Sequence, residues 1–315
     1  MHSDYEPGTA AGDDIWPPLP LAGWQDTLST LHMWTQIVGK TRLALAPHEN
    51  HWWQVALYLT SHGLTTAVMP YRGRALEVEF DFLAHRLLLR TSDGGTESVA
   101  LAPRTVADFY GAYLEALRSL RIEAPIRPVP VEVETAIPFA EDHAHAAYDA
   151  DAVQRWWRLL AQADRVLKRF RGRFVGKQSP VHFFWGSFDL AATRFSGRPA
   201  PVHPGGAPNC PDYVMVEAYN RECSSCGFWP GSPAVPEPAF YAYAYPEPPG
   251  YPGAPAGPKG AYYHRDMREF VLPYEAVRSS SAPDDMLLEF CQATYEAAAE
   301  GWDRGLLDRP RVGWP

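Results

Sequence analysis

The chain contains 315 residues, of which 46% are hydrophobic and 21% are charged, and its net charge is −9. This composition is typical of a globular protein, and the length suits two domains of ordinary size. The negative charge and the absence of a Lys/Arg run argue against a nucleic acid partner. No apolar run approaches the roughly 20 residues that a membrane helix needs, so no membrane partner is expected.

The N-terminal segment, MHSDYEPGTAAGDD, is acidic and polar and has no hydrophobic stretch behind it, unlike a signal or transit peptide. We therefore expect a cytoplasmic protein. Its four cysteines are Cys210, Cys223, Cys226 and Cys291. In that compartment they are expected to be free thiols or metal ligands rather than a disulfide framework.

The first part of the chain shows a helical pattern followed by several short apolar strands. The expected helix covers 24–37, and the expected strands cover 42–46, 52–60, 64–69, 76–82, 86–91 and 98–101. The pair Asp93-Gly94 predicts a hairpin turn between the last two strands. Thr105 fits the N-cap of a helix that ends near Leu120, with Asp108 in its first turn.

The segment 127–150 is rich in proline and acidic residues, which favours a linker. Beyond it we expect a long helix over 152–171, strands over 181–192, 239–245, 261–264 and 269–272, and a last helix over 283–300. Many of the 31 prolines fall between Pro199 and Pro258, and aromatic residues make up 13% of the chain. This composition predicts long, ordered, aromatic-packed loops rather than disorder.

A short pattern occurs twice along the chain. IVGKTRLALAPHENHWWQVALYLT (37–60) and FVGKQSPVHFFWGSFDLAAT (174–193) both place Val-Gly-Lys after a helical stretch and before His and two aromatics, and DFYGAYLEAL (108–117) matches EFCQATYEAA (289–298). We therefore predict an α+β fold of two pseudo-repeated halves, each an antiparallel sheet with flanking helices, related by an internal duplication. The first half would span 16–126, the linker 127–150, and the second half 151–302, with a Pro/aromatic-rich insertion at about 198–238.

Three stretches together resemble one known family. They are IWPPLPLAGWQDTLSTLHMWTQIVGKTRLALAP (15–47), SPVHFFWGSFDLAATRFSGR (179–198) and PEPAFYAYAYPEP (236–248). The chain resembles the uncharacterised bacterial family defined by the domain of unknown function numbered 5996. The resemblance implies a cytosolic bacterial protein and brings no assigned reaction, cofactor or catalytic residue. It also counts against a thiol or zinc role, because the family's pattern near ECSSCGFWPG does not depend on the cysteines.

Polar residues interrupt the apolar strand expected over 181–192. A period of two places His182 on the core face and Trp185, Ser187 and Asp189 on the opposite face. Asp189 can be interpreted as a general base or ligand anchor beside Trp185 and Ser187, with His182 as a second titrating group. Only the second copy of the repeat has a carboxylate at this place.

A structural interpretation of the same residues stays open. Asp189 would then face solvent or pair with Arg194 or Arg198. His182 would be a core histidine bonded to a backbone carbonyl, and its counterpart in the first copy, His51, favours this role in the shared fold.

The stretch PEPAFYAYAYPEP places three phenols on one face of a strand, about 7 Å apart. Tyr241, Tyr243 and Tyr245 could stack on a flat ligand or a sugar ring, with Glu237 and Glu247 as acceptors at the ends of the row. Alternatively, the row packs beneath a loop and its hydroxyls bond to the backbone.

The residue types in the second half also allow a zinc site. His203, Cys210, Cys223 and Cys226 offer the donor types of a tetrahedral zinc site, although a single Cys-x-x-Cys pair is a weak signal. No organic cofactor is predicted, and zinc is the alternative.

The two lysines of the Val-Gly-Lys triplets, Lys40 and Lys177, could bind an anion in a groove between the halves. Alternatively, both lysines have a structural role, because a cation at a helix C-terminus interacts favourably with the helix dipole.

We therefore expect a small-molecule site in the second half or between the halves, around Asp189, Trp185, Glu237, Tyr241 and Tyr243. Lys177 and Arg194 are further ligand-binding candidates. The first hypothesis is a cofactor-independent enzyme in which Asp189 and Glu237 act as acid and base, with His182 as a third catalytic candidate. The alternatives are a non-catalytic ligand-binding protein with an aromatic cleft, and a protein-interaction scaffold. The sequence indicates no oligomeric state.

Overall fold

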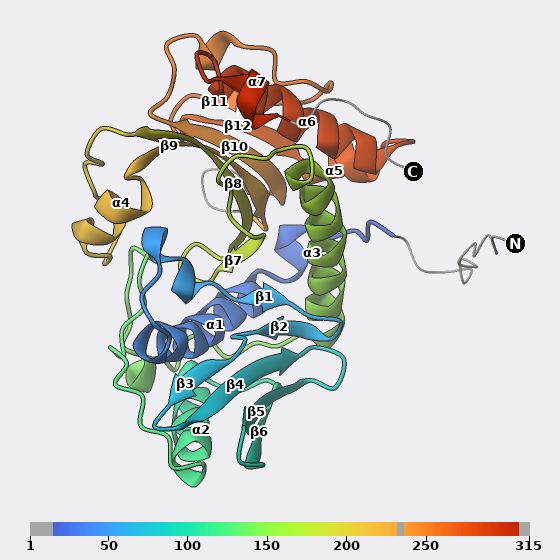
Figure 1. Cartoon of the computed structure of the whole chain (residues 1–315). Helices are drawn as coiled ribbons and strands as arrows, with labels where there is room; N and C mark the ends of the chain where they lie inside the picture. Colours follow the sequence, from blue (N-terminus) through green and yellow to red (C-terminus); the bar gives the residue numbers. More distant parts are fainter. Residues whose placement is uncertain (1–14, 232–235, 309–315) are drawn as a thin grey trace, which may run out of the picture.

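The computed structural model describes residues 15–231 and 236–308 (Figure 1). The acidic opening segment and residues 232–235 of the expected insertion lie outside the described residues. The fold is α+β, with two antiparallel sheets of six described strands each.

The first sheet has the strand order β1-β2-β4-β5-β6, and β3 pairs with β4. Its elements, in chain order, are η1 (Leu21–Gly23), α1 (Gln25–Leu45), η2 (Asn50–Val55), β1 (Tyr58–Leu59), β2 (Gly63–Thr65), β3 (Met69–Tyr71), β4 (Arg74–Asp81), β5 (Arg86–Thr91), β6 (Thr96–Ala100) and α2 (Val106–Ser119). The strand predicted over 86–91 and the helix start at Thr105 are confirmed, since the Thr105 hydroxyl accepts a hydrogen bond from the Asp108 backbone N–H at 3.0 Å. This bond satisfies one of the free N–H groups of the first helical turn.

Two predictions in this half are wrong. Residues 42–45 continue helix α1 instead of forming a strand, so Lys40 lies inside the helix and not at its end. Residues 52–55 of the strand expected over 52–60 belong to the turn η2, in which His51 and Trp52 adopt left-handed backbone angles, with φ of 63° and 61°. Strand β1 keeps only two residues of that expected strand.

The second sheet has the order β11-β12-β10-β9-β8-β7. Its elements are α3 (Ala150–Arg171), β7 (His182–Phe184), β8 (Asp189–Pro199), α4 (Asp212–Ala218), β9 (Arg221–Trp229), β10 (Ala239–Tyr245), η4 (Tyr251–Gly253), β11 (Tyr262–His264), β12 (Glu269–Pro273), α5 (Tyr274–Arg278), α6 (Pro283–Ala298) and α7 (Arg304–Leu307), and η3 (Phe139–Glu141) lies in the connection before α3. The strand predicted over 239–245 is confirmed. Strand β9 was not predicted.

The strand predicted over 181–192 is a hairpin, which changes the faces of its residues. Strands β7 and β8 pair antiparallel, and residues 185–188 form the turn between them. Phe184 pairs directly with Asp189, and His182 pairs with Ala191. Because paired residues share a face, Asp189 and His182 lie on the same face of the sheet and not on opposite faces.

Helices α3 and α6 pack against the other face of the second sheet (Figure 1). That face carries Leu190, Phe228 and Phe240, which are fully buried. The face opposite the helices carries Asp189 and Tyr241, and it is this face that the candidate site uses.

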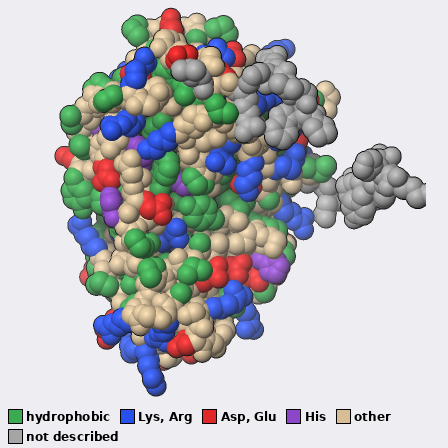
Figure 2. Space-filling model, in the orientation of Figure 1, with side chains coloured by type: hydrophobic (Ala, Val, Ile, Leu, Met, Phe, Trp, Pro, Cys, Tyr) green, Lys and Arg blue, Asp and Glu red, His purple; other side chains and the backbone are tan. Residues whose placement is uncertain are grey.

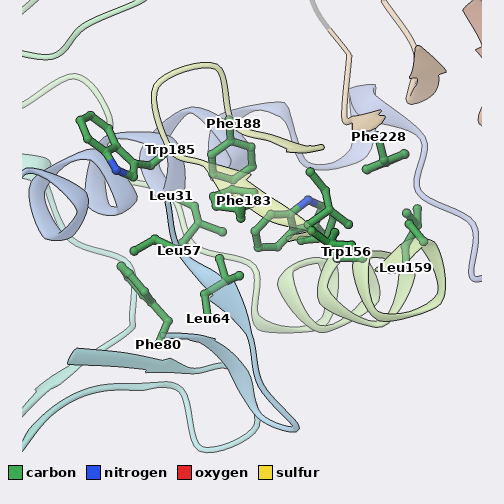
Figure 3. Close-up of a cluster of buried hydrophobic side chains, with 14 of the residues drawn as sticks. Leu31, Leu57, Leu64, Phe80, Trp156, Leu159, Phe183, Trp185, Phe188 and Phe228 are labelled. Carbon is green, nitrogen blue, oxygen red and sulfur yellow. The ribbon is translucent and has the colours of Figure 1, made fainter. Parts of the chain in front are cut away.

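The two sheets meet edge to edge between β1 and β7. Leu57 and Phe183 exchange two backbone hydrogen bonds, each 2.9 Å long. Around this pair one hydrophobic cluster includes side chains of both halves (Figure 3). Trp156 of α3 stacks on Phe188 with ring centroids 4.9 Å apart and also meets the edge of Phe82. The core is therefore continuous across the junction.

Within the described residues, no helix is long and apolar enough to cross a membrane. On the face drawn in Figure 2, acidic and basic side chains are interspersed.

Candidate functional site

The β7–β8 turn projects Trp185 against helix α1 (Figure 3). Gly39 makes this contact possible, because a Cβ atom at residue 39 would lie 2.3 Å from the indole ring. The indole N–H donates to the carbonyl oxygen of Val55 at 2.7 Å. The glycine of the first Val-Gly-Lys triplet therefore positions an aromatic ring from the other half of the chain.

Lys40, the next residue of α1, lies over this ring. Its ammonium nitrogen is 5.6 Å from the centre of Trp185, and the side chain is only 4% exposed. Within the described residues, no acidic side chain lies within 4.0 Å of this nitrogen. Burial, and secondly the charge of Arg127, lower the pKa of Lys40 to about 8, while Cys210 and Glu132 act in the opposite direction.

Glu132 reaches the turn from the connection between the halves. The side-chain amide of Gln36 fixes this segment, because it donates to the Val131 carbonyl at 2.8 Å and accepts from the Val131 N–H at 2.9 Å. Glu132 itself has a left-handed φ of 58° and donates its backbone N–H to Pro208. Its carboxyl group lies against Gly186, where an added Cβ atom would be 2.0 Å from a carboxyl oxygen.

The environment of Glu132 favours its protonated form. The packing of protein around the carboxyl group, followed by the charge of Asp189, raises its pKa to about 7. The residue as a whole is exposed, so solvent screens part of this effect.

Asp189 is the buried partner, with 8% of its surface exposed. Its carboxylate accepts hydrogen bonds from the Ser187 hydroxyl at 2.6 Å and from the Tyr241 phenol. Burial raises its pKa, and these two bonds act against the rise. The phenol crosses β9 at Gly227, where a Cβ atom would lie 2.5 Å from the phenol oxygen.

Ser187 connects the two carboxyl groups. Its hydroxyl also lies within hydrogen-bonding reach of Glu132. That hydroxyl donates its proton to Asp189, and its effect on Glu132 is to lower the pKa, against the rise caused by burial. Two carboxyl groups whose pKa values are raised by burial therefore meet at one serine side chain.

The comparisons with known proteins place the whole arrangement in one family. The profile of a family of unknown function, DUF5996, matches residues 16–309. The chain belongs to this DUF5996 family. A search of the curated proteins and a search of the solved structures returned no match. The matched region of the DUF5996 chain includes Lys40, Glu132, Ser187 and Asp189, so all four belong to the family domain.

In this DUF5996 protein the tyrosine row lies beside Asp189. Tyr241 and Tyr243 stack with ring centroids 6.1 Å apart. The Tyr243 hydroxyl lies 2.8 Å from the hydroxyl of Tyr219, and Tyr245 donates to the Pro201 carbonyl. The three hydroxyls of the row thus have protein partners, and only that of Tyr245 bonds to the backbone.

A third carboxyl group acts on the site from β12. Burial and the charge of Asp189 raise the pKa of Glu269 to about 7.

The remaining catalytic candidates lie apart from this arrangement. Glu237 is exposed, and the hydrogen bonds to Asp189 come from Ser187 and Tyr241. His182 is 1% exposed, and neither ring nitrogen has a hydrogen-bond partner among the described residues. Burial, followed by the charges of nearby arginines, lowers its pKa to about 3. The ring therefore stays neutral near pH 7, and the bond to a backbone carbonyl that the structural interpretation predicts is absent among the described residues.

The two basic ligand-binding candidates also have structural partners. Arg194 points to the helix-covered face, where its guanidinium lies 3.4 Å from the centre of the Phe170 ring and 4.3 Å from that of Tyr295. The Lys177 ammonium is 2.7 Å from Nε2 of His51.

The cysteines and His203 are also separated by the fold. Cys223 and Cys226 are three residues apart on β9, so their side chains point to opposite faces of the sheet. His203 stacks on Tyr219 with centroids 4.8 Å apart. In the part of the chain that the structure describes, the cysteines are free thiols, and no group of three or more His, Cys, Asp or Glu side chains is arranged to hold a metal ion.

Glu132 is not predicted as a site residue from the sequence. Lys40 is predicted to lie at a helix C-terminus, whereas α1 continues past it to Leu45. No local pattern marks Glu132, because its position depends on the pairing of Gln36 with Val131, 95 residues apart. For Lys40 the signal was the glycine before it, which is unfavourable in a helix interior and therefore points to a close contact.

Replacing Gly186 with alanine tests the placement of Glu132. The atom that meets the new methyl group is the far end of a flexible side chain, so we expect the free energy of unfolding to change by less than about 1 kcal/mol. The carboxyl group must move away from Ser187 and Asp189, and its pKa should fall from about 7 toward the ordinary value. A carboxyl-carbon NMR titration measures this shift, with Gly253→Ala as control because it has open space around it. An unchanged titration of Glu132 would contradict the placement.

Proposed function

We propose that this DUF5996 protein is a small-molecule enzyme that works without an organic cofactor and uses Glu132 as its acid–base residue. The single observation that carries the proposal is the meeting of two carboxyl groups with raised pKa values, Glu132 and Asp189, at the Ser187 side chain. The charge of Asp189 raises the pKa of Glu132, and carboxyl groups coupled in this way share protons so that one is an acid while the other is ionised.

The roles of the two carboxyl groups follow from their surroundings. Asp189 is buried and accepts two hydrogen bonds from hydroxyl groups, which favours its ionised form. Glu132 is exposed and has a pKa of about 7, so near neutral pH it can both give and take a proton. Glu132 is therefore the residue that meets the ligand, and Asp189 is a positioning residue that acts through Ser187.

The location of the site supports a ligand held between the halves. Lys40 comes from α1, Glu132 from the connection and Asp189 from β8, so the three ionisable groups belong to separate parts of the chain. Ionisable groups with shifted pKa values from distant segments converge more often at functional sites than elsewhere.

We also infer that the two halves arose by internal duplication. Both begin with a long helix, contain six strands and end with helical structure, and α4 interrupts the strands of the second half. The reciprocal hydrogen bonds between Leu57 and Phe183 give the two edge strands equivalent positions at the junction.

The proposal is tested by identifying the ligand and then its conversion. Native mass spectrometry of protein purified from its own host identifies a bound small molecule, and its turnover is followed with the wild type, Glu132→Gln and Glu134→Gln. Glu134 is an exposed acid of the same segment and serves as the matched control. We expect Glu132→Gln to reduce kcat by about 100-fold or more, in the range of a lost general acid–base residue, and Glu134→Gln to leave it unchanged.

Three results would speak against the proposal. Equal kcat values for the Glu132→Gln and wild-type proteins would remove Glu132 from the chemistry. A bound molecule that the wild type never converts would indicate a ligand-binding protein. Protein that carries no small molecule, and whose thermal stability no metabolite of a broad panel changes, would indicate a scaffold.

A further inference from the structure

Lysine is rare in this chain, and one of its few lysines is buried. The sequence contains Lys40, Lys168, Lys177 and Lys259, and the other 28 − 4 = 24 basic residues are arginines. Lys168 is ion-paired with Asp164 at 2.6 Å, Lys177 lies 2.7 Å from His51, and Lys259 is exposed. Lys40 differs from all three because it is buried beside the candidate site.

A purely structural cation does not account for this choice of residue. Arginine is the usual cation over an aromatic ring, is always charged and dominates the rest of the chain. A buried ammonium without a carboxylate within 4.0 Å loses hydration that the ring of Trp185 replaces only in part. What lysine offers and arginine does not is a neutral amine, which is a nucleophile.

We propose that the Lys40 amine forms an imine with an aldehyde or ketone group of the ligand. The amine nitrogen attacks the carbonyl carbon, and the C–O bond of the resulting carbinolamine breaks as the C=N bond forms. The oxygen leaves as water and takes up two protons in all, which come from the nitrogen. Glu132 transfers them by protonating the leaving hydroxyl and regaining a proton from the nitrogen, so no oxidant, reductant or other reactant is needed.

The surroundings of Lys40 suit this step. Burial lowers its pKa to about 8, so a much larger share of the amine is neutral at pH 7 than for a lysine with the ordinary value of 10.5. Glu132 acts electrostatically on the same amine, and it is the residue that the proposed function already assigns to proton transfer.

The inference rests on the proposed function, and it is tested with a probe that does not require the ligand. The full-length protein is treated at pH 7 with formaldehyde and cyanoborohydride, which reduces each imine to a methylated lysine. Peptide mass spectrometry then gives a separate rate for each of the four lysines. We expect Lys40 to react about tenfold faster than the more exposed Lys259, because burial lowers the pKa of Lys40 to about 8.

Lys177 is the internal control, because it belongs to the second Val-Gly-Lys triplet and is held by His51. Its rate should stay below that of Lys40. In the Lys40→Arg variant, whose folding is checked by its Tm, the fast phase of methylation should disappear and the rates at the other lysines should not change.

If Lys40 reacts no faster than Lys259, the amine is a packed cation and the imine proposal is wrong. The kcat comparison between Glu132→Gln and Glu134→Gln is unaffected by that result, because acid–base chemistry by Glu132 does not require a covalent intermediate. If Lys40 reacts fast and Glu132→Gln retains full kcat, the nucleophile stands and the acid–base assignment fails.

Discussion

Replacing His182 with phenylalanine is expected to stabilise the protein in acid. The free energy of unfolding of the variant, relative to that of the wild type, should be about 2 kcal/mol higher at pH 5 than at pH 7.5. The imidazole is 1% exposed, and its pKa in the folded protein is lowered to about 3. The unfolded chain binds a proton below the ordinary value of 6.5, whereas the folded protein does not. His182 therefore costs stability as the pH falls from 6.5 toward 3.

Phenylalanine fits this position because aromatic rings already surround it. Trp53, Tyr58 and Phe184 meet the His182 ring with centroid distances of 5.2 to 5.6 Å. Urea unfolding of both proteins at several pH values between 5 and 7.5 measures the effect. His143→Phe is the control, because the His143 side chain is exposed to solvent in the folded protein. Parallel pH profiles for wild type and His182→Phe would show that the folded protein protonates this ring.

Replacing Gly39 with alanine is expected to destabilise the protein by about 2 kcal/mol, although alanine is the better helix former. The new methyl group would lie 2.3 Å from the indole of Trp185. That ring is buried and bonded to the Val55 carbonyl, so it cannot move without losing contacts. Overpacking of this kind outweighs the gain of about 1 kcal/mol from helix propensity.

Gly111 gives a matched control for this substitution. It lies in helix α2 with open space where a Cβ atom would be placed. Gly111→Ala should raise the free energy of unfolding by about 0.5 to 1 kcal/mol, so the two alanine variants should differ by about 3 kcal/mol. Chemical denaturation of both variants measures the difference. A stabilising effect of Gly39→Ala would mean that Trp185 does not pack against α1.

Elements whose signals are local could be predicted from the sequence. The strand over 86–91, its hairpin turn at Asp93-Gly94 and the N-cap at Thr105 each depend on residues within a few positions, and the structure has them as expected. The strand over 239–245 follows in the same way from alternating aromatic and small side chains.

The errors occur where distant contacts decide the backbone. The turn between β7 and β8 contains no Asn-Gly or proline, and Phe188 adopts a left-handed φ of 59°. Stacking of Phe188 on Trp156 and packing of Trp185 on α1 hold this turn, and neither contact can be derived from local spacing. A continuous strand was the simpler interpretation, and it placed Asp189 on the wrong face relative to His182.

The candidate site could be predicted in part for the same reason. Ser187 and Asp189 are close in the sequence, and the structure brings Tyr241 to Asp189 from β10 across β9. Glu132 lies in a segment without secondary structure, and its place depends on one glutamine of α1. Composition indicated only a linker there.

The junction at Leu57 and Phe183 has a consequence for solubility. Strand β1 ends the first sheet and β7 ends the second, so each would otherwise present free backbone N–H and C=O groups along an apolar edge. Such edges pair readily with other chains and promote aggregation. Because each half covers the open edge of the other, the contact that joins the halves also removes a surface on which copies of the protein could assemble.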